Sequence, residues 1–153
     1  MTTLVVRLGE LGLENYAPYL MNRIMGRYNA ALKEEMSALG LTTQQMRALA
    51  VLSVVNGILI SELAVYAVVP QSTLSRALDA LVSDGMIRRE ADGTDSRAVR
   101  IFVTDTGREA YDRLWPHMAQ AYEAMFYGIS DEEKRVFIRT LQTMLRNIRK
   151  YNF

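Results

Sequence analysis

The sequence predicts a mainly α-helical fold with one small β-hairpin and long helices from both chain ends, and three observations support it. Apolar residues recur at helical spacing over residues 20–39 and again over residues 111–148. A short helix, a tight turn and a longer helix follow one another over residues 60–85. Two strand-like segments, at residues 86–90 and 98–103, flank a polar turn. We therefore treat the chain as a single unit with helical ends around a central section.

The composition limits the class of protein before any motif is considered. Half of the 153 residues are apolar, which is ample for a hydrophobic core. The absence of cysteine excludes disulfide scaffolds, cysteine-based zinc sites and thiol switches, and it favours an intracellular protein. Arg7 and Glu10 interrupt the N-terminal apolar run, and the longest uncharged runs fall short of the roughly 20 apolar residues of a membrane span. We therefore expect a soluble, cytoplasmic protein with no membrane partner and no cofactor.

Two amphipathic helices are predicted in the first third of the chain. Pro18 suits the first turn of the first helix, and Gly40 follows its last periodic apolar residue. Thr42 is predicted to cap the second helix, with Gln45 at the reciprocal position of a capping box. Residues 56–57, Asn-Gly, end that helix.

Residues 60–85 have the spacing of a helix-turn-helix. Pro70 pre-sets the second helix of this pair at its first turn, and Gly85 ends it. The apolar stripe of that helix is formed by Leu74, Ala77, Leu78 and Leu81. The opposite face carries Gln71, Ser72, Ser75, Arg76 and Asp79.

A hairpin and two further helices complete the predicted order. The turn at residues 91–94 can fold the strand at 86–90 back onto residues 98–103. Beyond Thr104 a long helix is predicted, and Pro116 is expected to kink it. Ser130 and Glu133 predict a second capping box for the last helix. The predicted buried face of that helix is Val136, Phe137, Leu141, Met144, Leu145 and Ile148.

The segment from Asp95 to Gly107 combines a polar turn, an alternating strand and a helix start. Asp95, Arg97, Thr104 and Gly107 match an Asp-x-Arg, strand, Thr-x-x-Gly signature. In this signature the chain resembles the MarR family of winged-helix transcription regulators, although Val103 stands where that family usually has Leu.

The resemblance covers about residues 16–148 and implies how residues 1–153 divide as one MarR-like unit. Residues 42–104 would form a winged helix-turn-helix DNA-binding region, and residues 1–40 and 105–153 would supply dimerisation helices. The implied function is that of a homodimeric transcription regulator, more often a repressor than an activator, on a pseudo-palindromic operator in double-stranded DNA.

Two residues depart from the family pattern. Val68 stands at the turn where the family often has Gly, and Pro70 stands where it often has a capping Ser. The sequence therefore leaves the tilt of the recognition helix open.

The residue types at the start of the second helix suit a recognition helix. Such a helix needs short polar side chains near its N-terminus and arginines for bidentate contacts in the major groove. Gln suits adenine, Arg suits guanine, and Ser or Thr suits a phosphate or a base. The candidates are Gln71, Ser72, Thr73, Ser75 and Arg76. A solvated helix face carries the same residue types, so this helix alone leaves both interpretations open.

The hairpin adds further candidates. Arg97 lies two residues after Asp95, close enough for the carboxylate to orient the guanidinium. An oriented arginine on a thin protrusion suits a narrow minor groove, where negative potential is focused, and the resemblance implies that role for Arg97. Arg88, Arg89 and Arg100 are interpreted either as phosphate contacts or as ordinary strand-surface charges. The candidate DNA-binding set therefore also includes Arg88, Arg89, Asp95 and Arg97.

Charge runs against a simple basic patch. The formal net charge is +1, and five arginines between residues 71 and 104 are matched by five acids in the same segment. We therefore expect modest and strongly salt-sensitive DNA affinity.

The chain ends carry more apolar surface than a small reading domain can cover. The N-terminal residues concerned are Leu4, Val5, Leu8, Leu11 and Leu13. With the apolar stripe of the last helix they predict a two-fold interface between copies of the chain, as the resemblance also implies. The alternative is a helical layer within a monomer.

A small aromatic effector is a further partner that the resemblance implies. Residues that could line its cleft are Tyr16, Tyr19, Met25, Tyr28, Met46, Tyr111 and Met118. Methionines and tyrosines at helical spacing more often pack cores, so none is assigned as a ligand contact and the existence of an effector stays open. A pH or anion sensor at His117, the only histidine, has equally little support.

The sequence argues against one other function class and leaves a second one open. The chain has no cysteine, one histidine and no phosphate loop, nucleophile elbow or zinc-helix motif, so we do not expect an enzyme. The remaining alternative is a winged-helix module for protein-protein interaction without DNA binding. Such a module would need neither Gln71, Arg76 nor Arg97, and the even charge balance keeps it open.

Overall fold

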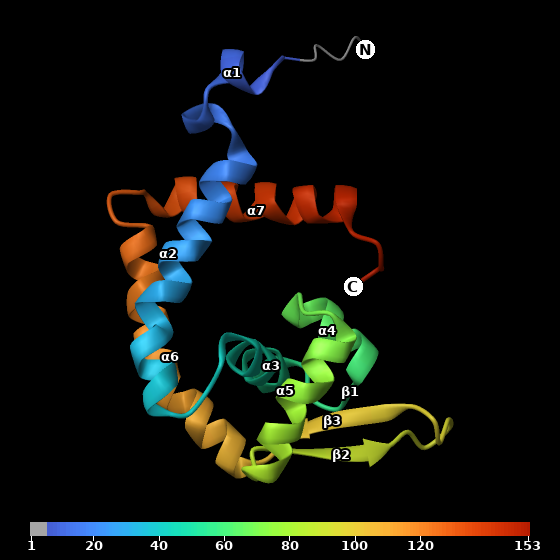
Figure 1. The fold of residues 1–153 in the computed structure, drawn as a ribbon. Helices are drawn as coiled ribbons and strands as arrows, with labels where there is room; N and C mark the ends of the chain where they lie inside the picture. Colours follow the sequence, from blue (N-terminus) through green and yellow to red (C-terminus); the bar gives the residue numbers. More distant parts are fainter. Residues whose placement is uncertain (1–5) are drawn as a thin grey trace.

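The computed structural model describes residues 6–153 and contains a frame of long helices beside a smaller unit of residues 43–103, which we call the reading head (Figure 1). Its elements in chain order are α1 (Leu8–Leu11), the 3-10 turn η1 (Leu13–Asn15), α2 (Ala17–Ala38), α3 (Thr43–Val54), β1 (Ile58–Leu59), α4 (Ile60–Ala67), α5 (Gln71–Ser83), β2 (Ile87–Ala91), β3 (Val99–Val103), α6 (Asp105–Met125) and α7 (Asp131–Ile148). The expected mainly helical fold with a β-hairpin is confirmed. The interpretation of Leu4 and Val5 lies outside the described residues.

The long helices form the frame. α2 and α6 lie side by side, and α7 crosses near the N-terminal half of α2 (Figure 1). α6 continues through Pro116 and bends along its course in Figure 1, in keeping with the expected kink. Within the part of the chain that the structure describes, none of the helices combines the length and hydropathy needed to span a bilayer.

Helix caps agree with the sequence at α3 and differ at α7. The Thr42 hydroxyl accepts from the Gln45 backbone N–H, and the Gln45 side chain accepts from the Thr42 N–H, which is the predicted capping box. At α7 the Ser130 hydroxyl accepts from the Glu133 N–H as predicted. The Glu133 carboxylate, however, accepts from the Ser130 hydroxyl at 3.0 Å instead of from the Ser130 backbone, because the hydroxyl lies within its reach. The reciprocal half of that predicted box was wrong.

The sheet has one strand more than predicted. β3 lies in the centre and pairs antiparallel with β2 and with the two-residue strand β1. Ile58 pairs with Ile101, and Ile87 pairs with Val103. Two residues are too few to show an alternating pattern, so β1 could not be recognised from the sequence. We call β2, β3 and the connecting residues 92–98 the wing.

The core lies between α2, α3, α4, α5, α6 and the sheet. Its fully buried large side chains are Leu32, Leu49, Leu52, Leu63, Leu74, Leu78, Leu81, Ile101 and Leu114. The predicted stripe of α5 is therefore confirmed at its three leucines. The predicted buried face of α7 is not buried within this chain, since α7 lies at the far end of the frame, away from the reading head (Figure 1). Its side chains are exposed, with Leu145 at 58% and Ile148 at 83%.

The C-terminal tail returns from α7 to the reading head (Figure 1). Phe153 packs against Tyr66 of α4, with 5.3 Å between the ring centroids, and Tyr151 stacks on Phe153. An aromatic contact thus joins the end of the frame to the first helix of the helix-turn-helix.

Candidate nucleic-acid interface

The turn between α4 and α5 contains a residue in the left-handed backbone conformation, and this residue is a valine and not a glycine. Val68 adopts φ 57° and ψ 49°, and the N–H of Val69 donates to the Ala64 carbonyl at 3.1 Å. This is the conformation that glycine usually supplies after a helix. Val69 is buried beneath the turn and fixes it to the core. The departure at Val68 therefore leaves the left-handed turn in place.

Pro70 occupies the N-cap position of α5, and the Leu74 N–H donates to its carbonyl at 2.9 Å. A proline side chain cannot accept a hydrogen bond, and none of the described side chains caps this helix. The first amides of α5 are consequently left for solvent or for an oxygen of a ligand.

The five candidate residues of α5 share one accessible face. Gln71, Ser72, Thr73 and Arg76 are exposed and Ser75 is half-buried, whereas the neighbouring Leu74 and Leu78 are buried. The core thus fixes one side of the helix and presents the polar side outward.

The loop of the wing holds Asp95 and Arg97 in contact. One carboxylate oxygen of Asp95, Oδ1, accepts from the Arg97 backbone N–H at 3.0 Å and from its Nε at 3.3 Å. The Arg97 side chain is 91% exposed, so its direction is set by this contact and not by packing. The orientation expected from the two-residue spacing is therefore present.

Arg88 and Arg89 are engaged within the chain in different ways. Arg88 pairs with Glu90 at 2.8 Å and lies over the Phe102 ring on the exposed surface of the sheet. Arg89 pairs with Asp79 at 2.7 Å and donates to the Ser75 carbonyl at 3.1 Å. Because Asp79 and Ser75 belong to α5, Arg89 ties β2 to that helix. An arginine has five N–H donors, so these contacts leave others for a phosphate.

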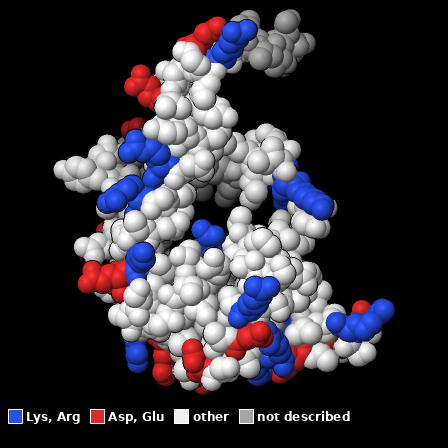
Figure 2. All heavy atoms as spheres, viewed as in Figure 1, with Lys and Arg blue, Asp and Glu red and all other residues white. Residues whose placement is uncertain are grey.

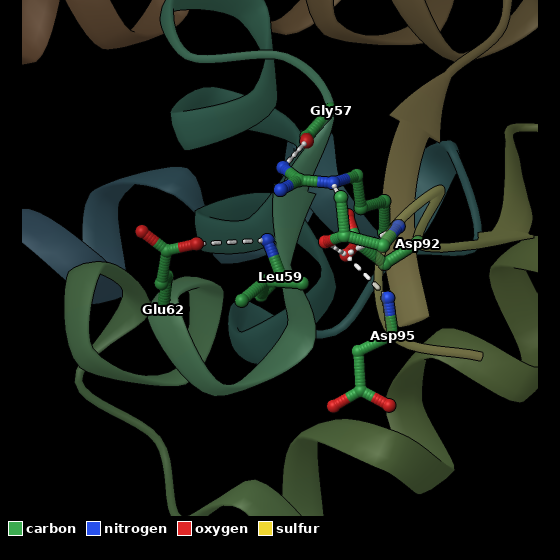
Figure 3. A network of polar contacts seen from close by, with 7 residues as sticks. Gly57, Leu59, Glu62, Asp92 and Asp95 are labelled. Carbon is green, nitrogen blue, oxygen red and sulfur yellow. Dashed lines mark hydrogen bonds and ion pairs between the residues drawn. The ribbon is translucent and has the colours of Figure 1, made fainter. Parts of the chain in front are cut away.

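A polar network at the base of the loop was missed by the sequence interpretation (Figure 3). Arg100 donates through Nε to Asp92 and through Nη1 to the Gly57 carbonyl at 2.8 Å. The hydrogen bond from the Thr94 hydroxyl, followed by that from Arg100, holds the pKa of Asp92 well below its usual value. The partners lie 8 and 43 residues from Arg100 in the sequence, so no local pattern could reveal them.

These pairs explain the even charge balance of the segment. Four acids, Asp79, Glu90, Asp92 and Asp95, each hold one of its five arginines. In Figure 2 blue and red side chains accordingly lie close together over α5 and the hairpin, in place of a continuous basic patch. Arg76 has no ion-pair partner among the described residues.

The residues considered for an effector cleft do not share one. Met46 and Met118 are buried in the core. Tyr28 lines an open groove of about 520 Å³ between α2 and α6, whose other residues include Arg23 and Arg27. Burial raises the pKa of the Tyr28 and Tyr111 phenols, so both stay protonated and uncharged at neutral pH.

Met25 lines a separate apolar groove of about 530 Å³ between α2, α6 and α7. His117 does not line either of these two grooves. Its Nδ1 lies 3.4 Å from the Glu35 carboxylate, and this contact links α6 to α2.

Comparisons with known proteins agree on one family. The sequence model described as the MarR family matches residues 39–98. A crystal structure of a MarR-family transcriptional regulator from Silicibacter pomeroyi is 56% identical, with a TM-score of 0.92, over 97% of this chain and 100% of that chain.

More distant relatives extend the comparison. The HTH-type transcriptional repressor IacR of Pseudomonas putida is 21% identical over 91% of this chain and 83% of its own length. The structure of CouR from Rhodococcus jostii, bound to p-coumaroyl-CoA, is 20% identical with a TM-score of 0.77, over 93% of this chain and 99% of that chain.

Proposed function

The chain belongs to the MarR family of winged helix-turn-helix transcription regulators, and we propose that it acts as a homodimeric repressor on a pseudo-palindromic operator. Repression is the function named for the relative from Pseudomonas putida. Blocking promoter access requires no catalytic group, only occupancy of the operator.

The observation that carries the proposal is the joint presentation of two DNA-reading elements by one rigid head. α5 turns its polar face outward from a fully buried leucine stripe, and the wing holds Arg97 almost fully exposed beside Asp95. Arg89 connects the two elements through Asp79 and the Ser75 carbonyl. A helix in the major groove and a wing in the adjacent minor groove require this fixed relation.

We assign the contacts by residue type. Gln71 and Arg76 would read base edges in the major groove, while Ser72, Thr73 and Ser75 would bind phosphates or bases. Arg97 would enter the minor groove with its direction set by Asp95. Arg88 and Arg89 would supply phosphate contacts at the edge of the sheet, with Arg89 also holding α5 in place.

The proposed dimer uses the helices outside residues 42–104, namely those of residues 1–40 and 105–153. Apolar side chains of α1, α7 and the N-terminal half of α2 are exposed in the single chain, including Leu8, Leu11, Leu20, Phe137 and Leu145. The apolar groove between α2, α6 and α7 lies in the same region. A second copy that covers this surface would place two reading heads on successive half-sites.

A small aromatic effector would act within the frame, in the groove between α2 and the C-terminal end of α6. The bound p-coumaroyl-CoA of the CouR structure supports a ligand of this class. Arg23, Arg27 and Tyr28 line the groove between α2 and α6 and could receive an aromatic group with an acidic substituent. Binding there would change the separation of the recognition helices by moving α2 relative to α6.

The test is binding of wild type and Arg97→Ala to DNA from upstream of the protein's own gene, titrated across salt against a scrambled duplex. We expect wild type to prefer the upstream duplex and Arg97→Ala to lose roughly tenfold in affinity, since a good base-edge or groove contact contributes about 1–3 kcal/mol. Arg139→Ala on the exposed polar face of α7 is the matched control, because it removes the same charge far from the reading head. Equal binding of both duplexes by wild type, with no effect of Arg97→Ala, would favour a protein-interaction module.

A further inference from the structure

Asp92 is the centre of the hydrogen-bond network that shapes the loop of the wing (Figure 3). Its Oδ2 accepts from the Thr94 hydroxyl at 2.6 Å, from the Thr94 N–H at 3.3 Å and from the Asp95 N–H at 3.1 Å. Its Oδ1 accepts from Arg100 Nε. The Asp92 side chain is only 11% exposed, because the loop folds around its carboxylate.

Arg100 anchors this network to the body of the reading head. Its second arm donates from Nη1 to the Gly57 carbonyl, in the segment that joins α3 to β1 (Figure 3). Gly57 itself is fixed: its N–H donates to the Ile101 carbonyl at 2.9 Å, and an added Cβ would lie 2.7 Å from the Phe102 ring. The planar guanidinium thus connects the loop of the wing to the segment at Gly57, with two donors in a defined geometry.

The network leads directly to the exposed arginine. Asp92 holds the backbone N–H of Asp95, and the carboxylate of Asp95 holds the backbone N–H and Nε of Arg97. Arg97 has little packing of its own, so the direction of its side chain depends on where Asp95 is placed. Gly57, Arg100, Asp92 and Asp95 therefore form a continuous path from the core to Arg97.

We propose that Asp92 and Arg100 act as positioning residues that hold the loop of the wing, and with it Arg97, in the conformation that enters the minor groove. This rests on the proposed DNA-binding function. In this role Arg100 acts through the carboxylate and the carbonyl that hold its Nε and Nη1, and not through a phosphate. Ordering the loop before binding removes an entropy loss that the complex would otherwise incur.

The first experiment is a double-mutant cycle with the upstream duplex. Asp92→Asn and Arg100→Gln are measured in the wild-type background and in the Arg97→Ala background. We expect each to weaken binding roughly fivefold to tenfold when Arg97 is present and by less than about twofold when it is absent. Arg100 would instead be a phosphate contact if its variant lost the same affinity in both backgrounds and if the slope of log affinity against log salt fell by about one. That result would overturn the proposal. Lack of any effect of Arg97→Ala on measurable DNA binding would overturn it as well.

Arg100→Lys separates charge from geometry. A lysine keeps the positive charge but cannot hold Asp92 and the Gly57 carbonyl with one planar group. We expect Arg100→Lys to bind DNA nearly as weakly as Arg100→Gln. Full affinity in the lysine variant would show that only the charge matters and would contradict positioning.

The second experiment needs no DNA and so distinguishes failure of the inference from failure of the proposed function. Amide hydrogen exchange of Thr94 and Asp95 is followed in the full chain, with the paired amides of β2 and β3 as the internal check of folding. Asp92→Asn and Arg100→Gln should accelerate exchange at these two amides by about fivefold or more, whereas Arg88→Gln should not. Arg88 is the matched control because it lies on the same sheet but pairs with Glu90 outside the loop.

The combined results have distinct meanings. Accelerated exchange in a protein that never prefers its upstream duplex would leave the loop network standing and count against the operator proposal. Unchanged exchange at Thr94 and Asp95 in both variants would show that Asp92 and Arg100 do not order the loop, whatever the DNA results.

Discussion

At the scale of single residues, Val68 adopts a strained backbone conformation that the turn between α4 and α5 requires. It is the only described residue other than glycine with a positive φ, and its side chain is 78% exposed. A β-branched residue in the left-handed region is strained by about 1–2 kcal/mol, and an exposed side chain gains little packing to offset this. The buried Val69 and the surrounding helices hold the turn in place.

Val68→Gly should therefore stabilise the protein by about 1 kcal/mol, since glycine removes the strain but adds some unfolded-state entropy. Thermal unfolding should move upward by about 2–4 °C for a chain of this size. Val54→Gly is the control: Val54 is equally exposed but ends a helix with ordinary dihedral angles, so its loss should destabilise. A lower melting temperature for Val68→Gly would show that the turn is not strained.

At the scale of elements, the junction between the hairpin and α6 explains the signature glycine. Thr104 caps α6 by accepting from the Gly107 N–H, and its own hydroxyl donates to the Gly85 carbonyl. The Thr104 N–H donates to the Met86 carbonyl at 3.0 Å. α6 is thereby pressed against the start of β2, where an added Cβ at Gly107 would lie 2.1 Å from the Met86 oxygen.

Gly107→Ala should destabilise the protein by about 3 kcal/mol, the upper part of the range for overpacked sites, because the obstructing atom is backbone and cannot turn aside. Gly26→Ala is the matched control, since Gly26 lies within α2 with nothing within 4 Å of an added Cβ and should gain about 1 kcal/mol of helix propensity. Chemical denaturation of both variants measures the difference. Similar stabilities would contradict the close approach of α6 to β2.

At the scale of the whole molecule, the frame is incomplete in a single chain. The reading head buries its own core, whereas α7 buries none of its residues and leaves an apolar face of Phe137, Leu145 and Ile148 in solvent. Apolar surface of this extent at one end of a protein is usually covered by a partner. We propose a second copy as this partner, because it exposes the same apolar surface and each copy can cover that of the other.

Leu145→Asp should convert the proposed dimer into a monomer and weaken operator binding severely, because it places a charge within the buried interface. Sedimentation velocity gives the mass, and the upstream duplex gives the affinity. Thr143→Asp is the control, since Thr143 belongs to the opposite face of the same helix and carries the same added charge. An unchanged mass for Leu145→Asp would place the dimer interface elsewhere or show that the chain is a monomer.

Much of this molecule follows from local sequence signals. The long helices, the capping box of Thr42 and Gln45, the buried leucines of α5 and the hairpin could be predicted, because caps, turns and apolar spacing act over a few residues. The face of α7 was predicted as an apolar stripe and assigned to an interface between copies of the chain, and none of its residues is buried within the single chain. A stripe indicates that a face needs covering and does not say whether the same chain covers it.

By itself the sequence determined the order of the longer helices and the hairpin, the polar face of α5 and the pairing of Asp95 with Arg97, all of which depend on neighbours within about one or two helical turns. The tertiary structure alone decided what holds each arginine of this segment. Arg89 is drawn to α5 and Arg100 to Asp92 and Gly57, while Arg97 stays exposed. The reason is physical: ion pairs and hydrogen bonds form between groups that folding brings together, and their partners can lie 43 residues apart in the chain.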